Sequence, residues 1–177
     1  MQPLDWSRYS TRYTRSSVPF FGLAVAVLLS LASPASSCTE QERRSLVDFL
    51  GGLAPGINGG LNVSWVNGTD CCKWEGIICG SDETVTDVLL ASRGLKGVIS
   101  PSLGNLTGLL RVNLSHNSLG GSLPTELVFS RSILVLDVSF NRLNGHLQEL
   151  QSSNPGLPLQ VLNISSNLFT GKFPSTA

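Results

Sequence analysis

The chain has 177 residues, of which 12 are basic and 12 acidic, so its formal net charge at pH 7 is +0 and only 14% of its residues are charged. With so few charges, no strongly basic face is available for a nucleic-acid partner. The length favours one domain or a short chain of several segments.

The first 37 residues have the composition of a secretory signal peptide. Arg8, Arg12 and Arg15 precede an uncharged apolar run over residues 18–32, and small residues follow that run. The run is shorter than the ~20 residues that cross a bilayer comfortably. We therefore predict a signal peptide over residues 1–37, cleaved after Ala35 or Ser37, with an uncleaved anchor as the alternative and no membrane span in the mature chain.

The four cysteines all follow this segment: Cys38, Cys71, Cys72 and Cys79. An even number of cysteines in a secreted chain predicts disulfides. Cys71 and Cys72 are adjacent and cannot easily reach disulfide geometry with each other. Cys38 therefore pairs with Cys71 while Cys72 pairs with Cys79, or the pairing is crossed. The spacing is not that of two zinc knuckles, so we predict no metal and no cofactor.

Residues 39–53 have the pattern of a capped amphipathic helix. Thr39 and Glu42 stand at the T-x-x-E spacing of a capping box. Apolar residues then fall on one helical face: Leu46, Phe49, Leu50 and Leu53.

The rest of the sequence repeats. Segments that begin at Leu106, Ser130 and Gly156 lie 24 and 26 residues apart and share the pattern L-x-x-L-x-L-x-x-N-x-L-x-G-x-L-P. Residues 85–100 fit the same frame, with Arg93 in the place of the asparagine. This is the leucine-rich repeat, whose period is 20–29 residues. We predict an α/β repeat solenoid with a parallel concave sheet, in about four coils over residues 80–177.

In each coil, the inward side chains of a short strand should be buried. The side-chain amide of the asparagine should form hydrogen bonds with backbone groups of the following turn. The chain should then bend at a glycine. A coil cannot bury its apolar residues alone, so stacking makes the core. The inward strand residues are Val112, Leu114, Leu136, Val138, Leu162 and Ile164; the asparagines are Asn117, Asn141 and Asn167; the later core residues are Leu119, Leu143 and Phe169; the glycines are Gly121, Gly145 and Gly171.

These motifs resemble the plant extracellular leucine-rich repeat family of receptor-like kinases, receptor-like proteins and polygalacturonase-inhibiting proteins. The endings "GSLP" and "GKFP" match its L-x-G-x-I-P variant, and "CTEQERRSLVDFL" with "CCKWEGIIC" is similar to its N-terminal cap. The segment "LQVLNISSNLFTGKFP" most resembles receptors for phytosulfokine and tyrosine-sulfated glycopeptides. The resemblance implies a disulfide-bonded helical cap over residues 38–79, with Cys38–Cys71 and Cys72–Cys79 bridges.

The same resemblance implies that Trp65 and Trp74 pack within the cap. Ser100 and Gln148 replace the proline that ends a repeat, so we expect those two turns to differ, and residues 151–158 to form a loop.

The sequence stops at Ala177, soon after a fourth repeat, without a terminal cap, a membrane span or a kinase. We therefore expect a truncated, N-terminal part of a receptor-like protein, which either self-associates through its uncapped last coil or is marginally stable there. In the resembled receptors the sulfated peptide sits on later repeats and an inserted island, so we expect residues 38–177 not to bind it.

No catalytic signature occurs. His116 and His146 are the two histidines of the chain, and we expect both of them, with Asp87 and Asp137, to be solvated surface groups. We therefore predict that the chain is not an enzyme.

The surface that should carry function is the concave sheet, where residues that flank the inward pairs face outward. Coil by coil these are Asp87, Leu89, Ala91 and Ser92; Arg111, Asn113, Ser115 and His116; Val135, Asp137, Ser139 and Phe140; Val161, Asn163, Ser165 and Ser166. The candidate binding residues among them are Asp87, Arg111, His116, Asp137 and Phe140.

Five sequons for N-glycosylation occur, at Asn62, Asn67, Asn105, Asn113 and Asn163. Asn113 and Asn163 stand in the same concave column, so we expect a glycan on one of them to cover part of that face.

The functional prediction is a non-catalytic extracellular module, secreted or at the cell surface, that binds a peptide, a protein or a co-receptor in plant signalling or defence. The alternatives are an enzyme inhibitor of the polygalacturonase-inhibiting kind and a truncated product without independent function.

Overall fold

The computed structural model describes residues 38–56, 58–147 and 156–172. The predicted signal peptide over residues 1–37, the substitution at Gln148 and most of the predicted loop lie outside the described residues. Within the described ranges, no helix has the length and apolar character needed to cross a membrane.

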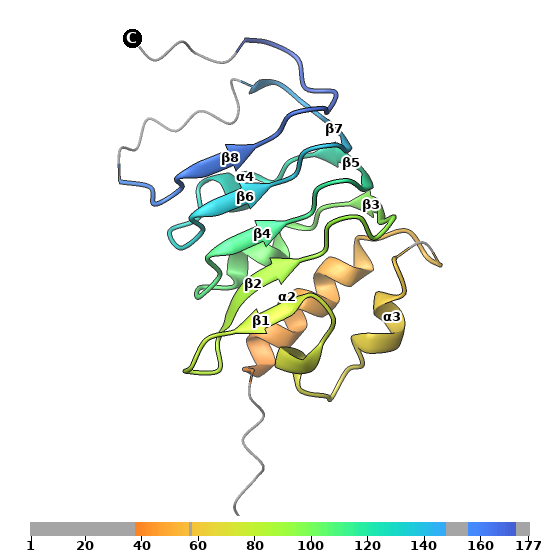
Figure 1. The fold of residues 1–177 in the computed structure, drawn as a ribbon, viewed down its shortest axis with the longest axis vertical. Helices are drawn as coiled ribbons and strands as arrows, with labels where there is room; N and C mark the ends of the chain where they lie inside the picture. The colour runs from red at the N-terminus through yellow and green to blue at the C-terminus, as the bar shows by residue number, and fades with distance from the viewer. Residues whose placement is uncertain (1–37, 57, 148–155, 173–177) are drawn as a thin grey trace, which may run out of the picture. The chain divides into compact units, whose positions relative to one another are not determined.

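The predicted solenoid is present, and it carries two sheets rather than one (Figure 1). The larger sheet has the strand order β1-β2-β4-β6-β8, and the smaller has the order β3-β5-β7. The first contains β1 (Ile77–Cys79), β2 (Val85–Leu89), β4 (Arg111–Asn113), β6 (Val135–Asp137) and β8 (Val161–Asn163); the second contains β3 (Lys96–Val98), β5 (Ser118–Ser122) and β7 (Arg142–Asn144). The repeat pattern predicted the first sheet and did not predict the second.

The sequence period sets the register of the larger sheet. Asp87 pairs in parallel with Arg111, Arg111 with Val135, and Val135 with Val161. Equivalent residues of successive coils therefore stand side by side. The predicted inward residues of β4 and β6 are fully buried, whereas Leu162, Ile164 and Phe169 are partly buried.

The predicted role of the asparagines is confirmed. Asn141 accepts a hydrogen bond from Leu119 N at 3.0 Å and donates from Nδ2 to the carbonyls of Leu114, Val138 and Ser139 at 2.9, 3.1 and 3.2 Å. Leu114 and Leu119 belong to the preceding coil, so one side chain closes its own turn and ties two coils together. Asn117 and Asn167 repeat this arrangement.

Short helical segments connect the strands in the described part of the chain: α3 (Leu61–Ser64), η1 (Cys71–Lys73), η2 (Pro101–Asn105) and α4 (Thr125–Val128). The turn at Ser100 does differ from its neighbour. The Ser100 hydroxyl accepts a hydrogen bond from Ser102 N at 3.2 Å and caps η2, while Pro124 precedes α4 without a side-chain cap.

Helix α2 (Glu40–Gly51) begins at the predicted capping box. The Thr39 hydroxyl accepts from Glu42 N, and Glu42 Oε2 accepts from Thr39 N at 2.9 Å. The other oxygen of the same buried carboxylate accepts from Val85 N, the first residue of β2, at 2.8 Å. Glu42 thus joins the start of the cap helix to the start of the sheet.

The cap also forms backbone hydrogen bonds with the first coil at the edge of each sheet. Strand β1 pairs antiparallel with β2. Beyond the end of α2, Leu53 bridges antiparallel to Gly97 in β3, with Ala54 N donating to Lys96 O at 2.8 Å and Val98 N to Gly52 O at 2.9 Å. Gly97 is required here, because its φ is +110° and a Cβ would lie 2.5 Å from Gly52 O.

The predicted packing of both tryptophans in the cap is observed. Trp65 and Trp74 stack with ring centroids 5.4 Å apart, and Phe49 of α2 lies 6.1 Å from Trp65. Each indole N–H has a partner, since Trp65 donates to Glu75 O and Trp74 to Thr69 Oγ1.

The structure contains the pairing that the family resemblance implies. Cys38 is bonded to Cys71 and Cys72 to Cys79, with 33 and 7 residues of sequence separation. The first bridge holds the start of α2 against η1, and its two cysteines are buried.

Replacing Glu42 with alanine should destabilise the fold by about 2–3 kcal/mol, because it leaves the Val85 and Thr39 N–H groups without their acceptor. Urea unfolding followed by circular dichroism measures the change. The matched control is Asp48→Ala, which removes an exposed carboxylate from the same helix and should change stability by less than about 0.5 kcal/mol. Equal stabilities of the two variants would contradict the role of Glu42.

The two bridges should contribute unequally. Loop closure predicts a loss of about 4 kcal/mol for Cys38→Ser with Cys71→Ser and about 2 kcal/mol for Cys72→Ser with Cys79→Ser. Unfolding of the two double variants tests the order, and peptide mapping without reduction tests the pairing. A Cys38–Cys72 peptide would refute it.

Candidate functional site

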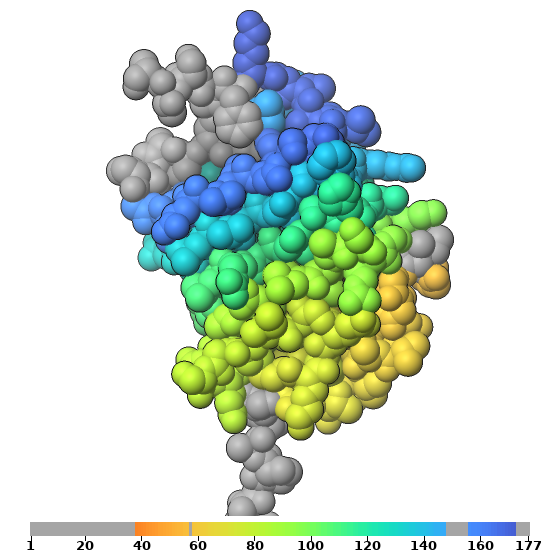
Figure 2. Space-filling view, viewed as in Figure 1, coloured from red at the N-terminus to blue at the C-terminus, as the bar shows by residue number. Residues whose placement is uncertain are grey.

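The concave face is formed by the outward side chains of β2, β4, β6 and β8 and of the residues that follow each strand. Figure 2 shows the coils as successive bands across this side of the molecule. The strand register places three columns of equivalent residues across the bands: Asp87, Arg111, Val135 and Val161; Leu89, Asn113, Asp137 and Asn163; and, after the strands, Ser92, His116, Phe140 and Ser166.

Asp87 is not the solvated group that we expected from the sequence. It is 2% exposed, and it pairs with Arg111 on the neighbouring strand and accepts a hydrogen bond from Thr86 Oγ1 at 2.8 Å. The hydrogen bond to Asp87, and then the charge of Asp87, raises the pKa of Arg111 above its usual range. The Arg111 side chain remains 59% exposed, so the pair presents a fixed guanidinium whose counter-charge lies beneath it.

The serines that follow the strands were also expected to face outward, but Ser115 and Ser139 are buried. The reason is a side-chain turn that recurs in the three coils with Asn or Asp at the end of the strand, and that is not formed in the first coil, where Leu89 stands in this place. Asn113 Oδ1 accepts from Ser115 N and Oγ, at 3.0 and 2.7 Å, and Asp137 Oδ1 accepts from Ser139 in the same way. Such Asx turns fix the chain as it leaves the strand.

The same turn explains why sequons recur on this face. Asn163 Oδ1 accepts from Ser165 N and Oγ, so the N-x-S spacing at Asn113 and Asn163 serves the fold, and Asp137 fills the equivalent place without being a sequon. The amide of Asn163 also donates to Asp137 Oδ2 at 3.2 Å. Asp137 is therefore half-buried and held by its neighbours rather than freely solvated.

His116 and Phe140 form an aromatic pair that the sequence analysis missed. Their rings stack with centroids 4.2 Å apart and planes 10° apart. They occupy equivalent positions of adjacent coils, and this register was the signal that could have revealed the pair. Phe140 is 50% exposed, so the pair forms a flat apolar platform at the end of the strands.

The backbone of this platform is left-handed. Ser92, His116, Phe140 and Ser166 have φ between +53° and +57°, a conformation that bulky residues seldom adopt. It is held by continuation of the ladder, since His116 N donates to Ser139 O and Phe140 N to Ser165 O, each at 3.0 Å.

His146 lies elsewhere. It bridges in parallel to Thr170 on the side of the smaller sheet, where its Nδ1 lies 3.3 Å from Thr170 Oγ1. The two histidines are therefore not brought together. Among the described residues, no group of three or more His, Cys, Asp or Glu side chains is placed to hold a metal ion.

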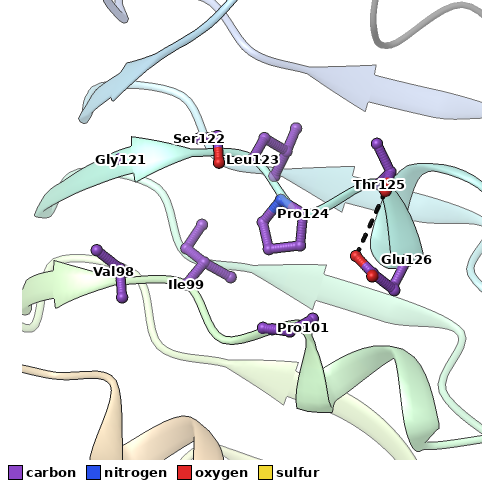
Figure 3. A pocket seen from close by; sticks show the side chains of 9 residues that line it. All are labelled: Val98, Ile99, Pro101, Gly121, Ser122, Leu123, Pro124, Thr125 and Glu126. Atoms are coloured by element: carbon purple, nitrogen blue, oxygen red, sulfur yellow. Dashed lines mark hydrogen bonds between the residues drawn. The ribbon is translucent and has the colours of Figure 1, made fainter.

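A hollow of about 480 Å³ lies between the first two coils, away from the concave face (Figure 3). Its ionisable lining residue is Glu126, which accepts a long hydrogen bond from Thr125 at 3.5 Å. The remaining lining residues are Val98, Ile99, Pro101, Gly121, Ser122, Leu123 and Pro124. This mostly apolar set offers no pair of groups for acid–base chemistry.

Comparison with known families agrees with this architecture. Residues 39–80 match the family described as Leucine rich repeat N-terminal domain, and residues 108–129 and 158–176 match Leucine Rich Repeat. The chain therefore contains the N-terminal cap that its motifs indicated, followed by leucine-rich repeats, and in both parts it is similar to plant leucine-rich repeat receptors.

Particular relatives are receptors of Arabidopsis thaliana. Phytosulfokine receptor 1 is 36% identical over 118 residues, which cover 66% of this chain and 12% of the receptor. Receptor-like protein 3 is 37% identical over 100 residues, covering 55% of this chain and 13% of that protein. The chain thus spans a small part of the length of these relatives.

Solved structures give the same result. The ectodomain of GASSHO1/SCHENGEN3 from Arabidopsis thaliana, in complex with CASPARIAN STRIP INTEGRITY FACTOR 2, matches with a TM-score of 0.60 and 26% identity over 72% of this chain and 15% of that one. The SOBIR1 ectodomain matches with a TM-score of 0.56 and 26% identity over 75% of this chain and 70% of that one.

The aromatic pair makes a direct prediction. The face of Phe140 should shift the ring protons of His116 upfield, and Phe140→Leu should abolish that shift, as seen by NMR of the histidine ring. The resonances of His146 are the internal control and should not move. Because aromatic pairs contribute about 0.5–1.5 kcal/mol, stability should fall by no more than this. Unchanged His116 shifts would show that the rings do not stack in solution.

Proposed function

We propose that this chain is a non-catalytic extracellular binding module, the N-terminal part of a receptor-like protein, and that it recognises a peptide or protein through the concave face. The observation that carries the proposal is the composition of this face. It combines a fixed guanidinium at Arg111, a row of amide and carboxylate groups, and the His116–Phe140 platform.

The physical basis is preorganisation. Each of these side chains stands on or directly after a strand, and its neighbours in the adjacent coil hold it in place. Binding groups on rigid elements lose little conformational freedom when a partner binds. Arginine and aromatic residues are also the side chains that contribute most at protein interfaces.

The disulfides and the family support a location outside the cell. Two bridges in so small a cap are typical of secreted proteins. The relatives are receptors, so the module would be secreted or displayed at the cell surface within a longer receptor. The GASSHO1/SCHENGEN3 complex shows that a related ectodomain holds a partner, and we extend this ability to the present chain.

Glycosylation would restrict the same face. A glycan on Asn113 or Asn163 would stand in the column between Arg111 and the platform. We therefore place the partner toward the ends of the strands, over His116 and Phe140, and expect a sulfated peptide not to be the ligand of these coils.

Selection of random peptides displayed on phage against the secreted chain tests the proposal. Selected peptides should bind Phe140→Ala and Arg111→Lys about tenfold or more weakly than the wild type. Phe140→Ala removes an exposed ring, and Arg111→Lys removes the planar guanidinium while keeping a positive charge opposite the buried Asp87. The matched control is Arg131→Ala, an exposed arginine that lies outside the strands. Failure to select any peptide, or selection of peptides that bind all four proteins equally, would contradict a concave binding site.

A further inference from the structure

A second polar site lies beside the cap, on residues that the concave face does not use. A hollow of about 240 Å³ is lined by side chains of the cap, of the turn before β2 and of the segment after η2. The lining residues are Thr39, Gln41, Glu42, Thr84, Asn105 and Thr107. Asn105 and Thr107 are the acceptor and the hydroxyl residue of one sequon, so the hollow begins at a potential attachment point for a glycan.

The walls of this hollow are firmly connected. Helix α2 packs beside η2, and Ser102 Oγ donates to Ser45 O at 2.8 Å across their contact. Glu42 binds Val85 N, which fixes the third wall. The hollow therefore spans the junction between the cap and the first coil, and an occupant would contact both.

The polar groups around the hollow fit a neutral, hydroxyl-rich occupant. Both oxygens of Glu42 already accept hydrogen bonds. The Thr84 hydroxyl donates to Asp82 at 2.8 Å, and this bond, followed by the backbone bond from Thr84, lowers the pKa of Asp82 below its ordinary value. Two carboxylates thus stand near the site and disfavour an anion. The Gln41 and Thr107 side chains are exposed and offer amide and hydroxyl groups.

The size agrees with the same class of occupant. At about 30 Å³ per water molecule, the hollow has the volume of about eight waters. This is room for one sugar ring rather than for a folded peptide segment.

Asn105 differs from the asparagines of the other four sequons in its position relative to the hollow. Asn113 and Asn163 use their side-chain oxygens in Asx turns. Asn62 and Asn67 are exposed on the cap. Asn105 is exposed at the end of η2 and lines the hollow itself.

We propose that Asn105 carries an N-linked glycan whose first sugar rests in this hollow and joins the cap to the first coil. The inference requires entry of the chain into the secretory pathway and is independent of the partner of the concave face. The co-reactant is the host's lipid-linked oligosaccharide. Nδ2 of Asn105 bonds to C1 of the sugar, the bond from C1 to the lipid diphosphate breaks, and one amide proton leaves while the diphosphate takes the electron pair.

The first test is occupancy. The full 177-residue chain is expressed in plant leaf cells and recovered from extracellular fluid and from membranes, and its tryptic glycopeptides are mapped by mass spectrometry. We expect a glycan on Asn105, retained in Thr107→Ser and lost in Thr107→Val. A bare Asn105, whether or not other sequons are occupied, overturns the proposal.

The second test asks whether the sugar rests in the hollow. Wild type, Gln41→Ala, Asn105→Gln and the double variant are compared by thermal unfolding. Loss of the glycan should lower the Tm by about 2–4 °C. Gln41→Ala should lower the Tm of the glycosylated chain and leave the Tm of the Asn105→Gln chain unchanged, because the cycle isolates the contact between Gln41 and the sugar.

Two controls keep the result specific. Asn67→Gln removes a cap sequon away from the hollow and should leave the Tm unchanged. Thr107 also lines a neighbouring hollow that contains Arg131, so Arg131→Ala should show no coupling to the glycan. Additive effects of Gln41→Ala and Asn105→Gln, or coupling to Arg131 instead, would overturn the placement of the sugar.

Discussion

The fold depends on one constraint: a coil of this length cannot satisfy its own backbone. The turn after each strand leaves N–H and C=O groups unpaired, and buried polar groups of this kind need partners. Asn117, Asn141 and Asn167 provide them, and each reaches into the preceding coil as it does so. The interaction that closes one coil is therefore also the interaction that aligns it with the next, and the columns of the concave face follow from this alignment.

The first coil lacks such an asparagine, because Arg93 stands in its place. Its backbone is held from both sides. Asn117 binds the backbone of Arg93 and Leu95 from the following coil, while Glu42 holds the start of β2 from the other side. The Arg93 side chain pairs with Glu75 of the cap. Two carboxylates of the cap thus tie it to the first coil, at the start of β2 and at the Arg93 side chain.

Much of the fold could be predicted from the sequence because the spacing of the repeat determines which residues of successive coils stand side by side. The inward strand residues, the asparagines and the capping box follow from spacing, and the packing of the cap tryptophans follows from the family resemblance. The second sheet could not be predicted, since β3, β5 and β7 are short and rich in glycine and polar residues, without an alternating apolar pattern. Those strands are recognisable only from the backbone hydrogen bonds between adjacent coils.

The candidate site was less predictable for a related reason. Spacing shows which side a residue faces, but not what covers it there. Asp87 faces the concave side as expected, yet Arg111 and β1 bury it. Ser115 and Ser139 turn inward because the Asx residues two positions earlier bind them. His116 and Phe140 meet because a left-handed residue redirects the side chain at the end of each strand, and nothing in the residue types themselves indicates that conformation.

The antiparallel pairing of the cap gives the stack a direction. Each coil offers its neighbour a parallel edge with evenly spaced, slanted hydrogen bonds, whereas an antiparallel strand presents bonds in alternating narrow and wide pairs. With β1 on the larger sheet and Leu53 on the smaller, both amino-terminal edges end in a hydrogen-bond pattern that differs from the one between coils. The two ends of the stack are therefore chemically different, because the cap covers its edge with antiparallel pairing whereas neighbouring coils meet each other in parallel.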